Sequence, residues 1–129
     1  MSAGGRGEAM NRRLIAQKYL EVAELAASEE GGAVNNVVVG VAVLAGIAAG
    51  DAICLTALGE RYAGTDHSEA VSVLRRVARE LADHLAKLVR LKPPSHYGNQ
   101  FVSTTDRTAA LRAARKLVEA ATERTSRAG

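Results

Sequence analysis

The sequence predicts an all-α protein whose helices form an up-and-down four-helix bundle. Ala, Leu and Val are abundant, whereas only two of the 129 residues are proline, and such a composition favours helices. Apolar residues recur every three or four positions along four long stretches, which is the spacing of one helical face. Short joins separate the stretches, and short joins favour antiparallel neighbours. One domain is therefore expected over residues 8–124, which is long enough to bury a core without disulfides.

The first helix is predicted over about residues 8–28, after a disordered start, MSAGGRG, at residues 1–7. The apolar residues of this helix step by four, three and four, which predicts one buried stripe: Ile15, Tyr19, Val22 and Ala26. Two glutamates and two glycines follow. Glycine readily takes the left-handed conformation that terminates helices, so the helix is expected to end there.

The second helix, about residues 35–61, is apolar on nearly every side, and a helix of this kind is a central one. Its main stripe is predicted to be Val37, Val41, Leu44, Ala48, Leu55 and Leu58. The valine run 37–39 could also form a buried strand, but the length of the segment favours a helix. Residues 37–50 are apolar without interruption until Asp51. A membrane span needs roughly 20 apolar residues, so a buried core helix is expected and no membrane.

The third helix is predicted over about residues 67–90. Asp66 and Glu69 form a capping-box pattern at its start. Its buried stripe steps by three and four without a break: Val71, Leu74, Ala78, Leu81, Leu85 and Leu88. The double proline at 93–94 is expected to stop this helix.

A long irregular linker is then predicted over residues 91–103, and long loops inside compact domains are often functional. The fourth helix follows over about residues 104–124, where Ser103 or Thr104 can cap it. Its inward residues are predicted to be Leu111, Ala114, Val118 and Ala121. The tail, residues 125–129, is expected to fray.

The charged residues are divided unevenly along the chain. Residues 1–64 hold five basic and seven acidic side chains, a net charge of −2, and residues 65–129 hold twelve and seven, a net charge of +5. A basic surface permits contact with phosphates, although a mixed charged surface is also ordinary for exposed helices. Aromatic residues make up only 3% of the chain, which argues against a stacking platform for single-stranded nucleic acid.

The lone cysteine, Cys54, excludes an internal disulfide and a thiolate metal cluster. It is expected to be a small buried hydrophobe in a protein of the reducing cytoplasm, and no secretory signal is visible. The three histidines form no metal-ligand spacing with one another or with Cys54, and phosphate-loop and nucleophile-elbow motifs are absent. The sequence therefore predicts no metal and no cofactor.

Three polar residues are expected to have structural roles. Asp51 falls on or beside the apolar stripe of the second helix, where a buried carboxylate needs a partner. It is predicted to anchor that helix to a neighbour or to a second copy, with proton handling as the alternative. Asp66 is predicted to cap the third helix, and His67 beside it is expected to be structural or exposed.

Arg90 and His96 are the candidate catalytic residues. An arginine can hold a phosphate through two parallel hydrogen bonds, and a histidine can move a proton to or from a ribose hydroxyl. Together they could cleave RNA without a metal. One histidine per chain is few for both acid and base roles, and a symmetric dimer would bring two of each into one cleft. Tyr97, Asn99 and Gln100 could position the substrate.

Two stretches resemble the HEPN superfamily of small all-helical domains. IAAGDAICLTALGERYAGTDHSEAVSVL, residues 47–74, is similar to that family's second long helix and the turn that follows it. RLKPPSH, residues 90–96, is similar to its Arg-x4–6-His signature. The resemblance covers roughly residues 10–122. It implies a helical bundle, usually a homodimer, and in active members a metal-independent ribonuclease with Arg90 and His96 lining the dimer cleft. Many members are toxins or defence proteins.

The sequence thus supports two functional hypotheses. The first is a cytoplasmic, dimeric domain that binds RNA or nucleotide phosphates and could cleave RNA, as toxin–antitoxin proteins of the family do. The second is a non-enzymatic helical dimer that docks onto another protein, such as an antitoxin-like partner. The large apolar surface of the second helix motivates the second hypothesis, because a lone domain of this size leaves part of it uncovered.

Overall fold

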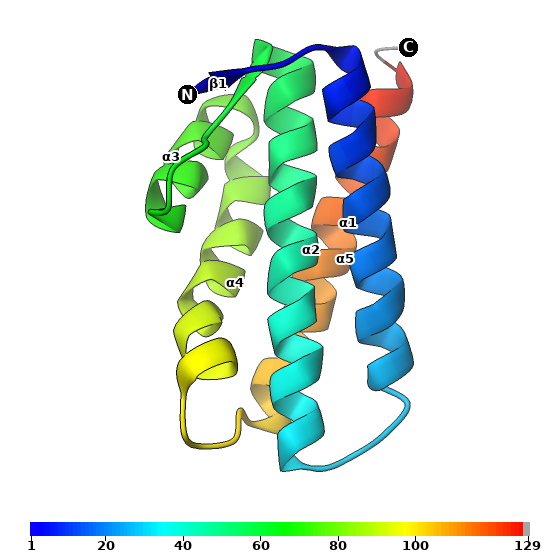
Figure 1. Cartoon of the computed structure of the whole chain (residues 1–129), viewed down its shortest axis with the longest axis vertical. Coiled ribbons are helices and arrows are strands. Elements are labelled where there is room, and N and C mark those ends of the chain that lie inside the picture. The colour runs from blue at the N-terminus through cyan, green and yellow to red at the C-terminus, as the bar shows by residue number, and fades with distance from the viewer. Residues whose placement is uncertain (128–129) are drawn as a thin grey trace.

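The computed structural model describes residues 1–127 and confirms the all-α prediction (Figure 1). The elements are β1 (Ser2–Ala3), α1 (Arg6–Ala26), α2 (Gly32–Leu58), β2 (Glu60–Arg61), α3 (His67–Val77), α4 (Arg79–Tyr97) and α5 (Thr104–Arg127). The helices α1, α2, α4 and α5 lie along the long axis of the molecule, and the short α3 packs outside α4. The central helix is α2, which contacts each of the other four.

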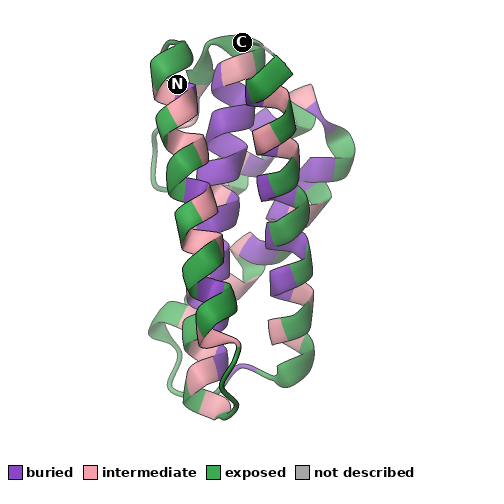
Figure 2. Ribbon diagram, turned by 90° about the vertical axis from the view of Figure 1, so that its right-hand side faces the viewer, coloured by how far each residue is buried: buried purple, intermediate pink, exposed green. Residues whose placement is uncertain are grey.

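The central position of α2 explains its composition. Figure 2 shows the buried residues gathered along this helix and on the inward sides of its neighbours. By length and hydropathy α2 could cross a membrane, but 78% of its most apolar window is buried inside the structure. Its surroundings are those of a core helix.

The buried stripe of α1 differs from the prediction. Ile15 and Val22 are 40% and 43% exposed, whereas Ala9, Ala16 and Ala23 are buried. The aliphatic periodicity suggested a stripe of large residues, but the alanines, spaced every seven residues, have no bulk beyond Cβ. They therefore let α1 approach α2 closely, and packing overrides side-chain size as a guide to burial.

The predicted stripe of α2 is also partly wrong. Ala48 and Leu55 are buried, but Val37 and Leu58 are 54% and 37% exposed, and Val41 is only half-buried. A helix that is apolar on every side has no distinct stripe, so periodicity cannot show which side stays uncovered. Here one edge of α2 remains partly open to solvent.

The N-terminus is not disordered as expected. Ser2 and Ala3 pair with Arg61 and Glu60 in an antiparallel two-stranded sheet, and the amide of Gly4 donates to the carbonyl of Gly59 at 3.0 Å. Gly59 ends α2 in the left-handed conformation, with φ of 71°. The turn after Gly59 exposes a short edge of backbone, which the N-terminal segment covers.

The predicted third helix is two helices. Ala78 has extended backbone, with φ of −155° and ψ of 98°, and it separates α3 from α4. All six residues of the predicted stripe are nevertheless buried. The apolar spacing thus identified the inward face correctly. It did not reveal the break, because Ala78 is neither glycine nor proline and tertiary packing imposes the bend.

The double proline does not stop α4, which continues to Tyr97. Each proline removes one backbone donor from the helix. Two side chains of the last turns make further contacts: Ser95 Oγ donates to the carbonyl of Lys92 at 3.1 Å, and the His96 ring lies against α2. The irregular linker is therefore confined to residues 98–103, and both candidate catalytic residues are helical.

Two asparagines of α2 and one arginine of α5 fix this linker. Asn35 Nδ2 donates to the carbonyl of Val102 at 3.0 Å, and Asn36 Oδ1 accepts from the amide of Val102 at 2.8 Å. Arg107 donates to Asn35 Oδ1 at 3.0 Å and also to the carbonyl of Ala27. The linker is thus tied to both ends of the α1–α2 join.

The inward face of α5 agrees with the prediction: Leu111, Ala114, Val118 and Ala121 are all buried. The helix extends to Arg127, however, so residues 125–127 are not frayed. Thr125 is buried and accepts a hydrogen bond from Arg13 Nη1 at 3.2 Å. The rest of the predicted frayed tail, residues 128–129, lies outside the described part of the chain.

Candidate functional site

Arg90 and His96 lie on one continuous helix and do not face each other. Six residues along an α-helix correspond to about 9 Å of rise and about 120° of rotation. Arg90 is exposed, and its side chain makes no hydrogen bond or ion pair with any other residue of the described range 1–127. The linker predicted over residues 91–103 would have placed His96 in a loop after the helix, and that prediction is wrong, because α4 continues to Tyr97.

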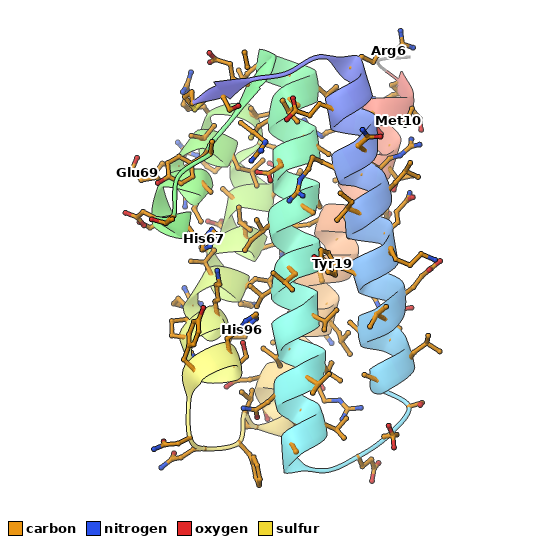
Figure 3. All side chains as sticks on the ribbon, in the orientation of Figure 1. Arg6, Met10, Tyr19, His67, Glu69 and His96 are labelled. Atoms are coloured by element: carbon orange, nitrogen blue, oxygen red, sulfur yellow. The ribbon has the colours of Figure 1, made fainter. Side chains whose placement is uncertain are left out.

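Lys92 takes the place beside His96 that was expected for Arg90. Residues four apart on a helix are neighbours on one face, so Lys92 and His96 share a face of α4. Lys92 Nζ lies 2.7 Å from Nε2 of His67, the first residue of α3. In Figure 3 the side chains of His67 and His96 both lie along α4. We call His67, Lys92 and His96 the basic cluster.

The protonation states within the basic cluster follow from its hydrogen bonds. An ammonium can only donate, so Nε2 of His67 accepts from Lys92 and the neutral ring carries its proton on Nδ1. Burial, and next the charge of Lys92, lower the pKa of His67 below its usual range, while Asp66 opposes this. His67 is therefore neutral and Lys92 charged near neutral pH.

His96 is held against the backbone of α2. Its Nε2 lies 3.2 Å from the carbonyl oxygen of Gly40, and because a carbonyl only accepts, this nitrogen carries a proton. A Cβ on residue 40 would lie 3.2 Å from the same nitrogen, so a larger residue there would crowd the ring. The ring of Tyr97 lies 5.9 Å from that of His96, and Tyr97 itself is 79% exposed.

The carboxylates near the basic cluster do not form ion pairs with Lys92 within the described residues. Asp66 caps α3: its Oδ1 accepts from the amide and the hydroxyl of Ser68 at 3.0 and 2.6 Å, which lowers the pKa of Asp66. The cap was predicted correctly. Glu69 points outward from α3 in Figure 3, and residues 32–50 of α2 include no titratable side chain. The cluster therefore has a net positive charge.

Asn99 and Gln100 lie apart from the basic cluster. They line a shallow hollow of about 400 Å³ together with Pro94 and the start of α5. The carbonyl of Gln100 accepts from Asn36 Nδ2 at 3.3 Å, which is a linker contact. Of the predicted positioning residues, only Tyr97 adjoins His96.

Asp51 is buried and ion-paired, as the structural prediction for it required. Its Oδ2 lies 3.0 Å from Arg12 of α1 and 3.8 Å from Arg61 of β2. Burial nonetheless raises the pKa of this carboxyl above its usual range, and the two guanidinium groups only partly offset that effect. Asp51 fastens α1 and β2 to the central helix.

Cys54 lies one helical turn beyond Asp51 and is buried. Burial raises the pKa of its thiol to about 11, with a further contribution from the charge of Asp51. The thiol is therefore protonated and unreactive near neutral pH. Among residues 1–127, no three His, Cys, Asp or Glu side chains gather in a way that could hold a metal ion.

Sequence reasoning missed Lys92 and expected His67 to be structural or exposed. One signal could have found Lys92: if α4 continues through the prolines, Lys92 and His96 are four apart and share a face. The contact between Lys92 and His67 spans 25 positions and depends on the break at Ala78, which no local pattern shows.

We found no match to this chain among protein-family models, curated proteins or solved structures.

Proposed function

We propose that the protein binds the phosphates of RNA or of nucleotides at the basic cluster of His67, Lys92 and His96. The observation that carries the proposal is the contact of the Lys92 ammonium with the imidazole of His67, one helical turn from His96, where no carboxylate of residues 1–127 pairs with the ammonium. Proteins commonly hold phosphates with cationic side chains that have no carboxylate partner. The positive charge of the second half of the chain supports the proposal by attracting polyanions from a distance.

The proposal keeps the resemblance to the HEPN superfamily and changes the residue that meets the phosphate. The arrangement of α1, α2, α4 and α5 is compatible with an up-and-down four-helix bundle, and we propose a cytoplasmic homodimer, as the resemblance implies. Arg90 and His96 of one chain diverge, so RNA cleavage by that pair would require a second copy to bring the two groups together. Binding of RNA or of a nucleotide at the basic cluster does not require a second copy.

Replacing Lys92 by glutamine tests the proposal. K92Q is expected to weaken binding of a short single-stranded RNA about tenfold, because it removes one charge-assisted hydrogen bond. R90Q is the matched control: it removes the same charge two residues away, and its effect is expected to stay below about threefold. Fluorescence anisotropy over a series of salt concentrations measures both affinities.

The same measurement can contradict the proposal. If R90Q weakens binding more than K92Q does, Arg90 is the phosphate ligand, and the basic cluster is not the site. If the affinity of the wild-type protein does not fall with salt, the contact is not with phosphates at all.

A second candidate function is favoured by an exposed aliphatic surface. The ion pair between Arg12 of α1 and Asp51 of α2 marks where the two helices meet. Residues three or four apart share one face of a helix, so a line of residues from Arg12 along α1 and another from Asp51 along α2 lie on the same side of the molecule. The partly exposed residues on these two lines are Ile15, Tyr19, Val22, Val37, Val41 and Leu44. We call them the aliphatic face. Such a surface suits a helical dimer that acts as a protein-interaction module.

A charge within the aliphatic face tests this second candidate. V37E is expected to turn a dimer at micromolar concentration into a monomer, because it would bury an unpaired carboxylate in the interface. L14E is the control: Leu14 is 52% exposed on α1 but lies off the face, so the oligomeric state should not change. Sedimentation velocity measures both. A wild-type protein that is monomeric at the same concentration would contradict the dimer.

A further inference from the structure

The contact between Lys92 and His67 has two consequences for an incoming anion. While Nε2 of His67 accepts from Lys92 at 2.7 Å, one of the three ammonium protons is committed to a neutral imidazole. An anion that takes up Lys92 gives this proton an alternative acceptor and leaves Nε2 free to bind a proton of its own. A protonated His67 then becomes a second donor to the same anion.

A second cation at His67, beside the ammonium of Lys92, favours a phosphate with a double charge. Lys92 and His96 share one face of α4, and His67 lies across from Lys92 at the start of α3. A terminal phosphate carries about −1.5 to −2 charges near neutral pH and three non-bridging oxygens. A phosphodiester within a strand carries one charge. Coulomb attraction grows in proportion to charge, so the terminal group gains more from a second cation.

We propose that the basic cluster selects a terminal phosphate monoester, at the end of an RNA strand or on a nucleotide, and that its binding transfers one proton from solvent to His67. This inference rests on the proposed phosphate-binding function and names the ligand class and the pH response of that site. Because binding takes up a proton, affinity rises as the pH falls towards the titration range of His67. Protonation of the phosphate itself, with a pKa near 6, limits the rise on the acid side.

The charged groups that face His67 act on its protonation in opposite directions: the charge of Lys92 opposes it, and Asp66 favours it. Within α3 and its cap the groups are Asp66, whose carboxylate is hydrogen-bonded to Ser68, and Glu69, which points outward. From α4 they are Lys92, whose ammonium lies 2.7 Å from Nε2 of His67, and His96, whose Nε2 proton is directed at the carbonyl of Gly40. The stretch 32–50 of α2 has no titratable side chain. Without a ligand, the stability of the fold changes with pH in the opposite direction to the affinity. The stability that comes from the Lys92–His67 contact is fully present above the ordinary pKa of histidine, and it is lost as the pH falls through the lowered pKa of His67.

Calorimetry with three ligands tests the inference on the full chain. The ligands are a short RNA with a 5′-phosphate, the same RNA with a 5′-hydroxyl, and adenosine monophosphate. Titrations near neutral pH in buffers of different protonation enthalpy give the number of protons taken up. We expect the 5′-phosphate RNA to bind at least about tenfold more tightly than the 5′-hydroxyl RNA, and to take up between about half and one proton.

Two variants separate the role of His67 from a general loss of charge. H67Q keeps an acceptor for Lys92 but cannot be protonated near neutral pH, so it should abolish proton uptake and reduce the preference for the terminal phosphate to below about threefold. H84Q removes the other imidazole of α4 and should behave as wild type. Circular dichroism checks that both variants fold.

The outcomes divide as follows. Equal binding of the two RNAs overturns this inference and leaves the proposed function standing. Absence of binding for all three ligands overturns both. A preference that persists in H67Q with unchanged proton uptake overturns the role of His67. Binding of adenosine monophosphate with the same proton uptake supports a free nucleotide as the ligand, and binding of the 5′-phosphate RNA alone supports the strand end.

Discussion

Replacing Asp51 by leucine is expected to lower the free energy of unfolding by about 3 kcal/mol. The substitution removes the carboxylate that lies 3.0 Å from Arg12 and 3.8 Å from Arg61. It leaves the Arg12 guanidinium without its ion-pair partner, whereas Arg61 keeps its contact with Glu8. Breaking a buried ion pair on one side costs roughly 3–5 kcal/mol, and we take the lower end because water reaches part of each arginine. Urea denaturation followed by circular dichroism measures the change.

The double variant D51L/R12L is the control for this prediction. Replacing both partners by apolar residues of similar size is often neutral, so the double variant should recover most of the loss seen in D51L. Glu8 lies 3.5 Å from Arg61 and remains to pair with it. If D51L and D51L/R12L are equally unstable, the loss comes from a packing defect at residue 51 and not from the unpaired charges.

The pH dependence of D51L gives an independent reading. Burial raises the pKa of Asp51 in the folded protein, so the folded state binds this proton more tightly than the unfolded state does. The resulting stability is fully present below the unfolded pKa and is lost as the pH rises through the folded pKa. Wild type should therefore lose stability relative to D51L between those two values. A difference between the two proteins that stays constant across acid pH would contradict the raised pKa.

The parts of the fold that were predictable are those where one face is apolar and the other charged. Charged residues flank the buried faces of α3 and α4, which include Leu74 and Leu88, and the buried face of α5, which includes Leu111 and Val118. Hydrophobic spacing alone therefore identified the buried side of these helices. In α2 nearly every residue is apolar. Burial there depends on which neighbours cover it, and Val37 and Ala48 cannot be told apart by residue type alone.

The candidate site was only partly predictable for a related reason. Asp66 was identified as a cap because capping depends on residues close in the sequence. The basic cluster depends on a bend at Ala78 and on a helix that runs through a double proline, and both are decided by packing. His96 was found as a residue type that can transfer protons, but its neighbour Lys92 followed only once α4 was known to reach Tyr97.

Truncating Leu88 to alanine is the other change with a large expected effect. Leu88 is fully buried between α4 and α2, so L88A should cost about 3 kcal/mol of unfolding free energy through lost burial and a residual cavity. G46A acts on the same contact from the other side. A Cβ on residue 46 would lie 2.3 Å from Leu88 Cδ1, so the leucine must move. G46A should therefore cost about 1 kcal/mol or more, despite the higher helix propensity of alanine.

The double variant G46A/L88A separates this close contact from ordinary packing. The methyl group introduced at position 46 can occupy space that Leu88 vacates, so the double variant should be at least about 1 kcal/mol more stable than the sum of the two single losses predicts. G50A is the matched control in the same helix. A Cβ there would lie 3.4 Å from Leu85, an ordinary contact, so G50A should leave the stability unchanged or raise it by up to about 1 kcal/mol. Urea denaturation of the four variants measures these differences. Additive losses in G46A and L88A would show that α2 and α4 adjust independently, and that the glycine at position 46 is not required for their close approach.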